Sequence, residues 1–230
     1  MIQWLWIFLN FSSALVCLED PSVKLHFLRL AWKLDTGGGR DKSYNELVVN
    51  GVRFPGERKW DLRWNLIKDV ISFKGKKILE LGSNVALASV YLLKYRKAAS
   101  CTAVDLPNAQ LAQRGTPHLL RAARLVQRAF GMRVKLLQVD LNKNNYESSI
   151  GYSYDVVICM SLLKWVHDKE RLLQFLSHFP HVIYEGHDSD DREIARFRAH
   201  GFTSHKILGK THIGVSYASD KKRTLIYFSR

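Results

Sequence analysis

The chain has 230 residues, of which 47% are hydrophobic, 24% are charged and 11% are aromatic. A chain of this length and composition can bury a sizeable core, which excludes an intrinsically disordered protein and a disulfide-stapled mini-protein. The 35 Lys and Arg against 21 Asp and Glu leave a net charge of +14. Such a field attracts nucleic acid, an acidic membrane surface or a phosphorylated metabolite alike. The surplus belongs to residues 21–135, so we expect an anionic partner to meet the N-terminal half.

The cysteine and histidine patterns argue against metal and disulfide chemistry. The three cysteines, Cys17, Cys101 and Cys159, are an odd set, and the last two lie in apolar runs where small buried thiols are common. The sequence contains neither a Cys-x-x-Cys pair nor His-Glu-x-x-His. We therefore predict no disulfide framework and no metal site.

The first 18 residues are apolar apart from four polar positions. No Lys or Arg precedes this run, and its polar interruptions suit a bilayer-spanning helix poorly. A core or docking helix is favoured, while a signal segment or membrane-associated segment remains the alternative. We interpret residues 1–45 as a helical N-terminal extension and residues 46–230 as one further domain, and expect a cytoplasmic protein.

From residue 78 onward, short apolar runs alternate with amphipathic stretches, which is typical of βα units around a parallel sheet. Two strand-like pieces then close the chain and favour an antiparallel hairpin. The expected strands are 78–81, 100–104, 134–139, 155–160, 182–184, 204–208 and 224–228, and the expected helices are 86–95, 109–130, 168–178 and 190–200. The pattern predicts an α/β fold with an open, mostly parallel sheet, helices on both faces and an antiparallel C-terminal edge strand.

A turn with an acidic residue before it follows the first expected strand. The segment 78–86 reads Ile-Leu-Glu-Leu-Gly-Ser-Asn-Val-Ala, and the carboxyl edge of an open α/β sheet is where ligands bind. A dinucleotide site would need Gly-x-Gly-x-x-Gly, whereas this turn has Gly82 followed by Asn84 and Ala86. The sequence therefore weakens a dinucleotide interpretation.

This segment resembles motif I of the class I S-adenosylmethionine-dependent methyltransferases, Glu/Asp-x-Gly-x-Gly-x-Gly, with Asn84 and Ala86 in place of two glycines. The resemblance implies a Rossmann-like fold and S-adenosyl-L-methionine as cofactor. It further implies that Asp105 accepts hydrogen bonds from the ribose hydroxyls and that Asp140 contacts the adenine amino group. The cofactor contacts expected in this part of the chain are Glu80, Gly82, Ser83, Asn84, Asp105, Leu106, Asp140, Leu141 and Ser161.

The residues support this interpretation independently of the resemblance. Glu80, Asp105 and Asp140 each lie at or near the end of an expected strand, where they can converge on a nucleoside. The alternative is that these carboxylates only cap the helices that follow.

The approach segment, residues 50–67, is similar to that of methyltransferases related to the tRNA wobble-uridine modifying enzymes and to polysaccharide-terminating methyltransferases. By that resemblance, Arg58 or Arg63 pairs with the carboxylate of the methionine moiety, which suits the guanidinium fork. The alternative is an amphipathic helix with Trp60, Trp64 and Ile67 directed inward.

Several acceptor classes lack their signature after the fourth expected strand. Neither Asp/Asn-Pro-Pro-Tyr nor Pro-Cys is present, and Ser161 stands where ribose 2′-hydroxyl methyltransferases carry Asp. The candidate catalytic residues are therefore His167, Glu185 and His187. A surface-helix histidine competes with the first, and a helix N-terminus built from acidic residues competes with the other two.

We expect an enzyme that moves a methyl group to an oxygen or nitrogen of a small molecule, a glycan or RNA. Because two motif glycines are replaced, the alternative is a weak or inactive binding module whose basic face meets RNA or an anionic membrane. Arg121, Arg124 and Arg128 share one face of an expected helix, which fits such a surface or a merely solvated one. A third hypothesis is a membrane-associated protein that its first residues anchor.

Overall fold

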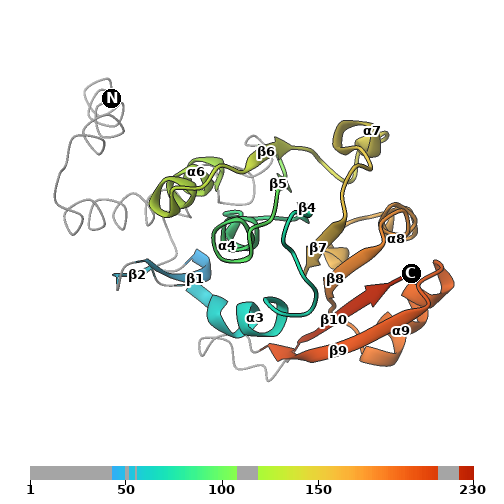
Figure 1. Cartoon of the computed structure of the whole chain (residues 1–230). Coiled ribbons are helices and arrows are strands. Elements are labelled where there is room, and N and C mark those ends of the chain that lie inside the picture. The colour runs from blue at the N-terminus through green and yellow to red at the C-terminus, as the bar shows by residue number, and fades with distance from the viewer. Residues whose placement is uncertain (1–42, 50–51, 55, 108–118, 212–222) are drawn as a thin grey trace.

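A computed structural model describes residues 43–49, 52–54, 56–107, 119–211 and 223–230 (Figure 1). The expectations for the first apolar segment, for Cys17 and for residues 109–118 of the second expected helix lie outside this part of the chain.

The main sheet has seven strands in the order β6-β5-β4-β7-β8-β10-β9. Strands β4 to β8 are parallel, and β10 is antiparallel to both β8 and β9. The predicted α/β sheet with its antiparallel C-terminal edge is therefore confirmed. The strands are β4 (Lys77–Leu81), β5 (Ser100–Asp105), β6 (Lys135–Gln138), β7 (Val156–Met160), β8 (His181–Glu185), β9 (Ser204–Thr211) and β10 (Arg223–Ser229).

Helices cover both faces of this sheet (Figure 1). One apolar cluster packs α3, α4 and α6 against the first face, and a second packs α7, α8 and α9 against the other. The central strand β7 is buried on both faces because its residues alternate between these two clusters. The helices are α3 (Trp60–Ile67), α4 (Leu87–Arg96), α6 (Leu119–Phe130), α7 (Tyr146–Ile150), α8 (Lys169–Leu176) and α9 (Asp190–Ala199), with a 3₁₀ turn, η1, at Leu163–Trp165.

A second, three-stranded sheet precedes the main one and was not expected from the sequence. It consists of β1 (Ser43–Val49), β2 (Val52–Phe54) and β3 (Gly56–Lys59), in the order β2-β1-β3. Strand β1 also spans the boundary that we expected between residues 45 and 46. These strands are short and carry charges, so their sequence lacks the long apolar run that marks the main strands.

Helix α3 follows directly and has the expected amphipathic character in part. Trp60 and Ile67 are buried and Trp64 packs against the same cluster. Arg63 is buried on the same helix, with 2% of its surface exposed. A buried arginine needs a compensating partner, which makes its surroundings informative.

None of the helices in the described ranges is both long enough and apolar enough to cross a bilayer.

Candidate functional site at the carboxyl edge of the sheet

The turn after β4 keeps the backbone conformation of a glycine-rich loop although two glycines are replaced. Gly82, Asn84 and Ala86 all have left-handed φ angles, 64°, 52° and 57°. Asn adopts this region readily among non-glycine residues, whereas Ala pays a steric penalty there. A Cβ on Gly82 would lie 2.9 Å from Cδ1 of Leu162, so this position also has no room for a side chain. The loop therefore retains its shape where the sequence departs from the motif.

Asp105, the last residue of β5, holds this loop. Its Oδ2 accepts a hydrogen bond from the backbone N–H of Asn84 at 2.6 Å, and its Oδ1 accepts one from the N–H of Leu106 at 2.8 Å. The N–H of Ser83 donates to the carbonyl of Val104 at 3.0 Å. These bonds join the ends of β4 and β5 and fix the Asp105 carboxylate at the edge of a pocket.

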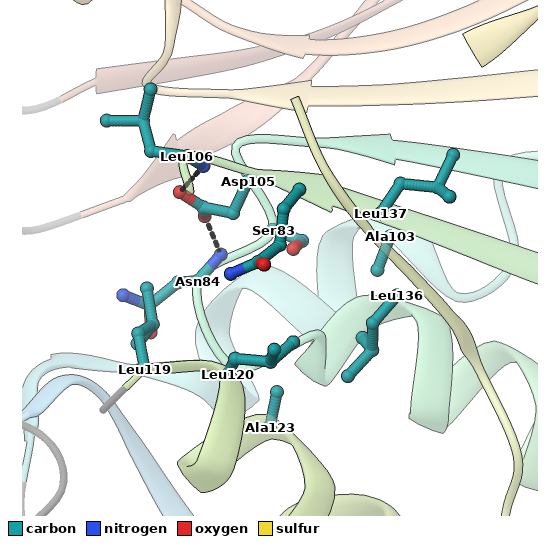
Figure 2. Close-up of a pocket in the computed structure, with 11 residues that line it drawn as sticks. Ser83, Asn84, Ala103, Asp105, Leu106, Leu119, Leu120, Ala123, Leu136 and Leu137 are labelled. Atoms are coloured by element: carbon teal, nitrogen blue, oxygen red, sulfur yellow. Dashed lines mark hydrogen bonds between the residues drawn. The ribbon is translucent and has the colours of Figure 1, made fainter. Parts of the chain in front are cut away.

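The pocket lies between this loop, the ends of β5 and β6, and the start of α6 (Figure 2). Asp105 and Asn84 form its polar side, while leucines from α6 and β6 form an apolar wall. Asn84 Oδ1 is buried without a hydrogen-bond partner in the described part of the chain. A carboxylate beside an apolar wall suits a nucleoside, which presents hydroxyl groups and a flat base. The lining residues are Ser83, Asn84, Ala103, Asp105, Leu106, Leu119, Leu120, Ala123, Leu136, Leu137 and Gln138.

Glu80 lies behind the loop, and its bonds point to α4. Its Oε2 accepts from the N–H of Ser89 at 2.9 Å and from the Ser89 hydroxyl at 2.6 Å. Burial raises the pKa of Glu80 to about 7, against the opposing effect of the Ser89 hydrogen bonds. The carboxylate thus braces the start of α4, and its predicted contact with the cofactor stays a prediction.

Asp140 and His167 are brought together indirectly. Asp140 Oδ1 accepts from the N–H of Asn142 at 3.0 Å, and Asn142 Oδ1 accepts from the N–H of His167 at 2.7 Å. The amide of Asn142 therefore ties the end of β6 to the segment after β7. The His167 side chain is exposed, and Leu141 packs in the second apolar cluster.

Glu185, at the end of β8, is the centre of a buried ionic cluster and has no exposed surface. Arg63 donates to Oε1 at 3.1 Å and to Oε2 at 2.5 Å, and Arg58 lies 3.4 Å from both oxygens. The hydroxyls of Ser161 and Thr211 also donate to Glu185. Burial alone would raise the pKa of Glu185, but Arg63 and Arg58 hold it at about 2. Glu185 is therefore ionised and surrounded by donors.

The same cluster joins four parts of the chain. Arg63 donates to Oδ1 of Asn45 in β1 at 3.0 Å, and Arg223 of β10 donates to the Ser161 hydroxyl at 2.6 Å. Ser161, the residue after β7, has a φ of 59°, an unfavourable conformation for a side-chain-bearing residue. Its N–H donates to the carbonyl of Glu185 at 2.9 Å. The cluster therefore holds a strained residue at the carboxyl edge.

His187 is half-buried two residues beyond Glu185. Both ring nitrogens are shielded from solvent and have no hydrogen-bond partner among the residues that the structure describes. Burial, followed by the positive charge of Arg223, lowers the pKa of His187 to about 4. The imidazole is therefore neutral at pH 7.

The structure brings eight of the predicted site residues together in two groups. Ser83, Asn84, Asp105 and Leu106 line the pocket, whereas Arg58, Arg63, Ser161 and Glu185 meet in the ionic cluster. The expected pairing of either arginine with a cofactor carboxylate stays a prediction, as do the proton-transfer roles of the three catalytic candidates.

Sequence reasoning missed several residues of both groups. Asn45, Thr211 and Arg223 belong to the ionic cluster, and Leu119 and Leu136 belong to the pocket wall. An arginine at the start of a strand otherwise rich in apolar residues is the one signal that could have identified Arg223.

In the described ranges, no group of three His, Cys, Asp or Glu side chains could hold a metal ion. Cys101 and Cys159 are buried free thiols, and burial raises the pKa of Cys159 to about 12.

No protein-family model matches the sequence, and no curated protein matches it by sequence. The fold, in contrast, is shared with solved structures. The N-terminal domain of EvdMO1 with S-adenosylhomocysteine bound superposes with a TM-score of 0.63 at 17% identity, over 90% of this chain and 96% of that domain. Against the longer EvdMO1 structure, the TM-score is 0.55, and this chain spans 43% of that protein's length and is itself covered to 80%.

Two further solved structures are similar in fold. A putative S-adenosylmethionine-dependent methyltransferase from Streptococcus mutans gives a TM-score of 0.54 at 18% identity, over 80% of this chain and 55% of that one. A precorrin-6y C5,15-methyltransferase from Geobacter metallireducens gives a TM-score of 0.55 at 12% identity, over 75% of this chain and 89% of that one. The chain therefore has the Rossmann-like α/β fold of these proteins.

Proposed function

We propose that the protein is an S-adenosylmethionine-dependent methyltransferase that acts on an oxygen or nitrogen of its acceptor. The observation that carries the proposal is the turn after β4, whose three left-handed residues are bonded through Asn84 to the Asp105 carboxylate at a pocket. The fold is shared with proteins described as S-adenosylmethionine-dependent, one of them with S-adenosylhomocysteine bound. The preserved loop shape also counts against the alternative of a module that lost its cofactor site.

In this proposal Asp105 accepts hydrogen bonds from the ribose hydroxyls. The backbone N–H groups of Asn84 and Leu106 each donate to one of its oxygens, which fixes the carboxylate at the edge of the pocket, where ribose hydroxyls would meet it. Leu106 and the leucines of α6 and β6 supply the apolar wall for the adenine. The bound cofactor would supply an electrophilic methyl group at the carboxyl edge.

Isothermal titration with S-adenosylhomocysteine tests the proposal. We expect Asp105→Asn to bind at least ten-fold more weakly than the wild type, because a hydrogen bond to a charged group contributes about 1.5–3 kcal/mol. Asp155→Asn is the matched control, since Asp155 also accepts a backbone hydrogen bond, from Lys77 at 2.7 Å, but at the opposite end of the sheet. A wild-type protein that binds neither the cofactor nor its demethylated product would reject the function.

His187 is the residue that we propose as the base for the acceptor proton. Its ring is neutral at pH 7 and its nitrogens are unoccupied by the residues described, whereas the oxygens of Glu185 are saturated by donors. Glu185 then acts as a positioning residue that holds Ser161 and the arginines.

A glycan is the acceptor to test first, since the approach segment resembles polysaccharide-terminating enzymes and the EvdMO1 domain was also crystallised in the presence of D-fucose. Product formation would be measured over a panel of sugars, amines and RNA. With an acceptor found, His187→Gln should lower kcat about 100-fold, the range of general-base catalysis, and leave the affinity for S-adenosylhomocysteine unchanged. An unchanged kcat would remove His187 from this role.

A further inference from the structure

Nine of the basic residues that follow β3 lie at the end of the sheet opposite to the pocket. Parallel strands β4, β5 and β6 begin at this edge, and helices α4 and α6 end there. We call this surface the amino-end rim. It consists of Lys74, Lys76, Lys77, Lys94, Arg96, Lys97, Arg128, Arg133 and Lys135.

The rim is continuous, because hydrogen bonds join its segments. The N–H of Gly75 donates to the carbonyl of Lys97 at 3.0 Å, and the N–H of Ala99 donates to that of Lys76 at 2.9 Å. Lys94 Nζ reaches the carbonyl of Phe130 at 3.4 Å, which places the ends of α4 and α6 side by side. β5 separates the starts of β4 and β6, which lie roughly 10 Å apart by the spacing of strands in a sheet.

The amino-end rim carries many more basic than acidic side chains, so it is complementary to a polyanion. Seven of the nine basic side chains are exposed: Lys74, Lys77, Lys94, Lys97, Arg128, Arg133 and Lys135. The described carboxylates at this edge are Asp69, which pairs with Arg96 at 2.8 Å, and Asp155, which accepts from the N–H of Lys77. Because the spacing of the rim charges is comparable to the Debye length of about 8 Å at physiological salt, their fields add.

An aromatic side chain stands within the rim. Tyr95 is 46% exposed, has the Lys94 Nζ 5.9 Å from its ring centroid, and packs edge-to-face on Tyr91 with ring centroids 5.2 Å apart. Arg96 covers the ring of Trp64 at 5.5 Å. An exposed ring flanked by cations is a platform on which a nucleobase stacks while the phosphates meet the charges. The described rim segments expose no large aliphatic side chain that could insert into lipid.

From these observations we infer that the amino-end rim binds a single strand of nucleic acid, through its phosphates and by stacking on Tyr95. Strand β4 has five residues, which corresponds to about 15–17 Å, so a strand bound at the rim lies far from His187. The rim therefore tethers the nucleic acid rather than presenting the bound nucleotides for methyl transfer. This inference stands independently of the proposed function.

The test is fluorescence anisotropy of the full chain with a labelled 20-nucleotide RNA between 50 and 200 mM salt. The variant Lys74→Gln/Arg133→Gln/Lys135→Gln removes the charges of three exposed side chains. We expect its affinity at 50 mM salt to fall at least ten-fold, and the slope of log K against log salt to fall by about 2, since each phosphate contact contributes about 0.7 for single strands. Tyr95→Ala should weaken binding about five-fold with the salt slope unchanged.

The matched control is Arg198→Gln/Lys206→Gln/Lys210→Gln, which removes the same charge from α9 and β9. It should bind RNA within two-fold of the wild type. Both triple variants should bind S-adenosylhomocysteine as the wild type does, so loss of RNA binding is separated from loss of the cofactor site. The inference would be overturned by equal losses of RNA affinity in the two triple variants or by a wild type that does not bind RNA at 50 mM salt. It would also be overturned if the wild type bound phosphatidylserine vesicles but not RNA.

Discussion

Two buried glutamates at the same edge of the sheet show opposite electrostatics. Glu80 in β4 is 4% exposed and Glu185 in β8 is fully buried. Glu80 receives hydrogen bonds from Ser89, a neutral residue, and its pKa rises to about 7, whereas two arginines hold the pKa of Glu185 at about 2. Burial is common to both, so the charge of the partner decides which state the carboxyl group adopts.

The surroundings of the two glutamates also differ in their structural role at the carboxyl edge of the sheet. The turn that follows Glu80 forms a pocket from its backbone conformation and from apolar side chains, and Glu80 itself does not line this pocket. Around Glu185, in contrast, a single buried carboxylate accepts hydrogen bonds from α3, from β3, from the residue after β7 and from β9, and so connects these elements. Removing the two carboxylates should therefore have unequal consequences.

The largest expected effect is that of Glu185→Gln. The substitution leaves Arg58 and Arg63 buried without their shared carboxylate, and breaking a buried ion pair from one side costs about 3–5 kcal/mol. Glu80→Gln keeps an oxygen that accepts from Ser89 and removes a carboxyl group whose ionisation burial disfavours, so at pH 7 it should not destabilise the protein. Urea unfolding at pH 7 measures both free energies. Similar losses of unfolding free energy in the two variants would contradict the distinction between Glu80 and the ionic cluster around Glu185.

The pH dependence of stability should also have opposite signs at the two sites. The folded-state pKa of Glu185 is depressed, so its stabilisation is complete above its ordinary pKa of 4.5 and is lost as the pH falls through about 2. The folded-state pKa of Glu80 is raised, so its contribution is most favourable below 4.5 and declines as the pH rises to about 7.

The Glu80 shift corresponds to about 3 kcal/mol. We therefore expect the free energy of unfolding of the wild type to fall by about that amount relative to Glu80→Gln between pH 4.5 and 7.5. Urea titrations at a series of pH values measure the difference. A constant difference between the two proteins over this range would show that Glu80 is not protonated in the folded state near neutrality.

The sequence allowed the main sheet to be predicted because each parallel strand is a short apolar run. The runs at 78–81 and 155–160 correspond to β4 and β7 within a few residues. The strand Gly56–Lys59 could not be predicted, since it has three charged residues among four and gains its pairing from β1. The five-residue helix α7 was missed for a different reason, because so short a segment has no periodicity to detect.

The site was predictable only where it is local. Asp105 was identified because it ends a strand, and it does hold the loop. The cluster around Glu185 joins residues separated by 122 and 127 positions, and no local pattern records such a pairing. The two glycine replacements suggested a degraded loop, whereas the backbone shows that Asn84 and Ala86 adopt the conformation that glycine would.

The smallest expected effects concern that loop and compare Gly82 with Ala86. Gly82→Ala adds a Cβ in the left-handed region, which costs about 1–2 kcal/mol, and brings it to 2.9 Å from the flexible end of Leu162, so we expect a loss of about 2 kcal/mol. Ala86→Gly relieves a similar strain but removes a fully buried methyl group, worth about 0.8 kcal/mol, and increases the freedom of the unfolded chain. These contributions nearly cancel, so its unfolding free energy should stay within about 0.5 kcal/mol of the wild type. Urea unfolding measures both variants, and a gain of more than 1 kcal/mol for Ala86→Gly would mean that the loop stores more strain than its φ angle indicates.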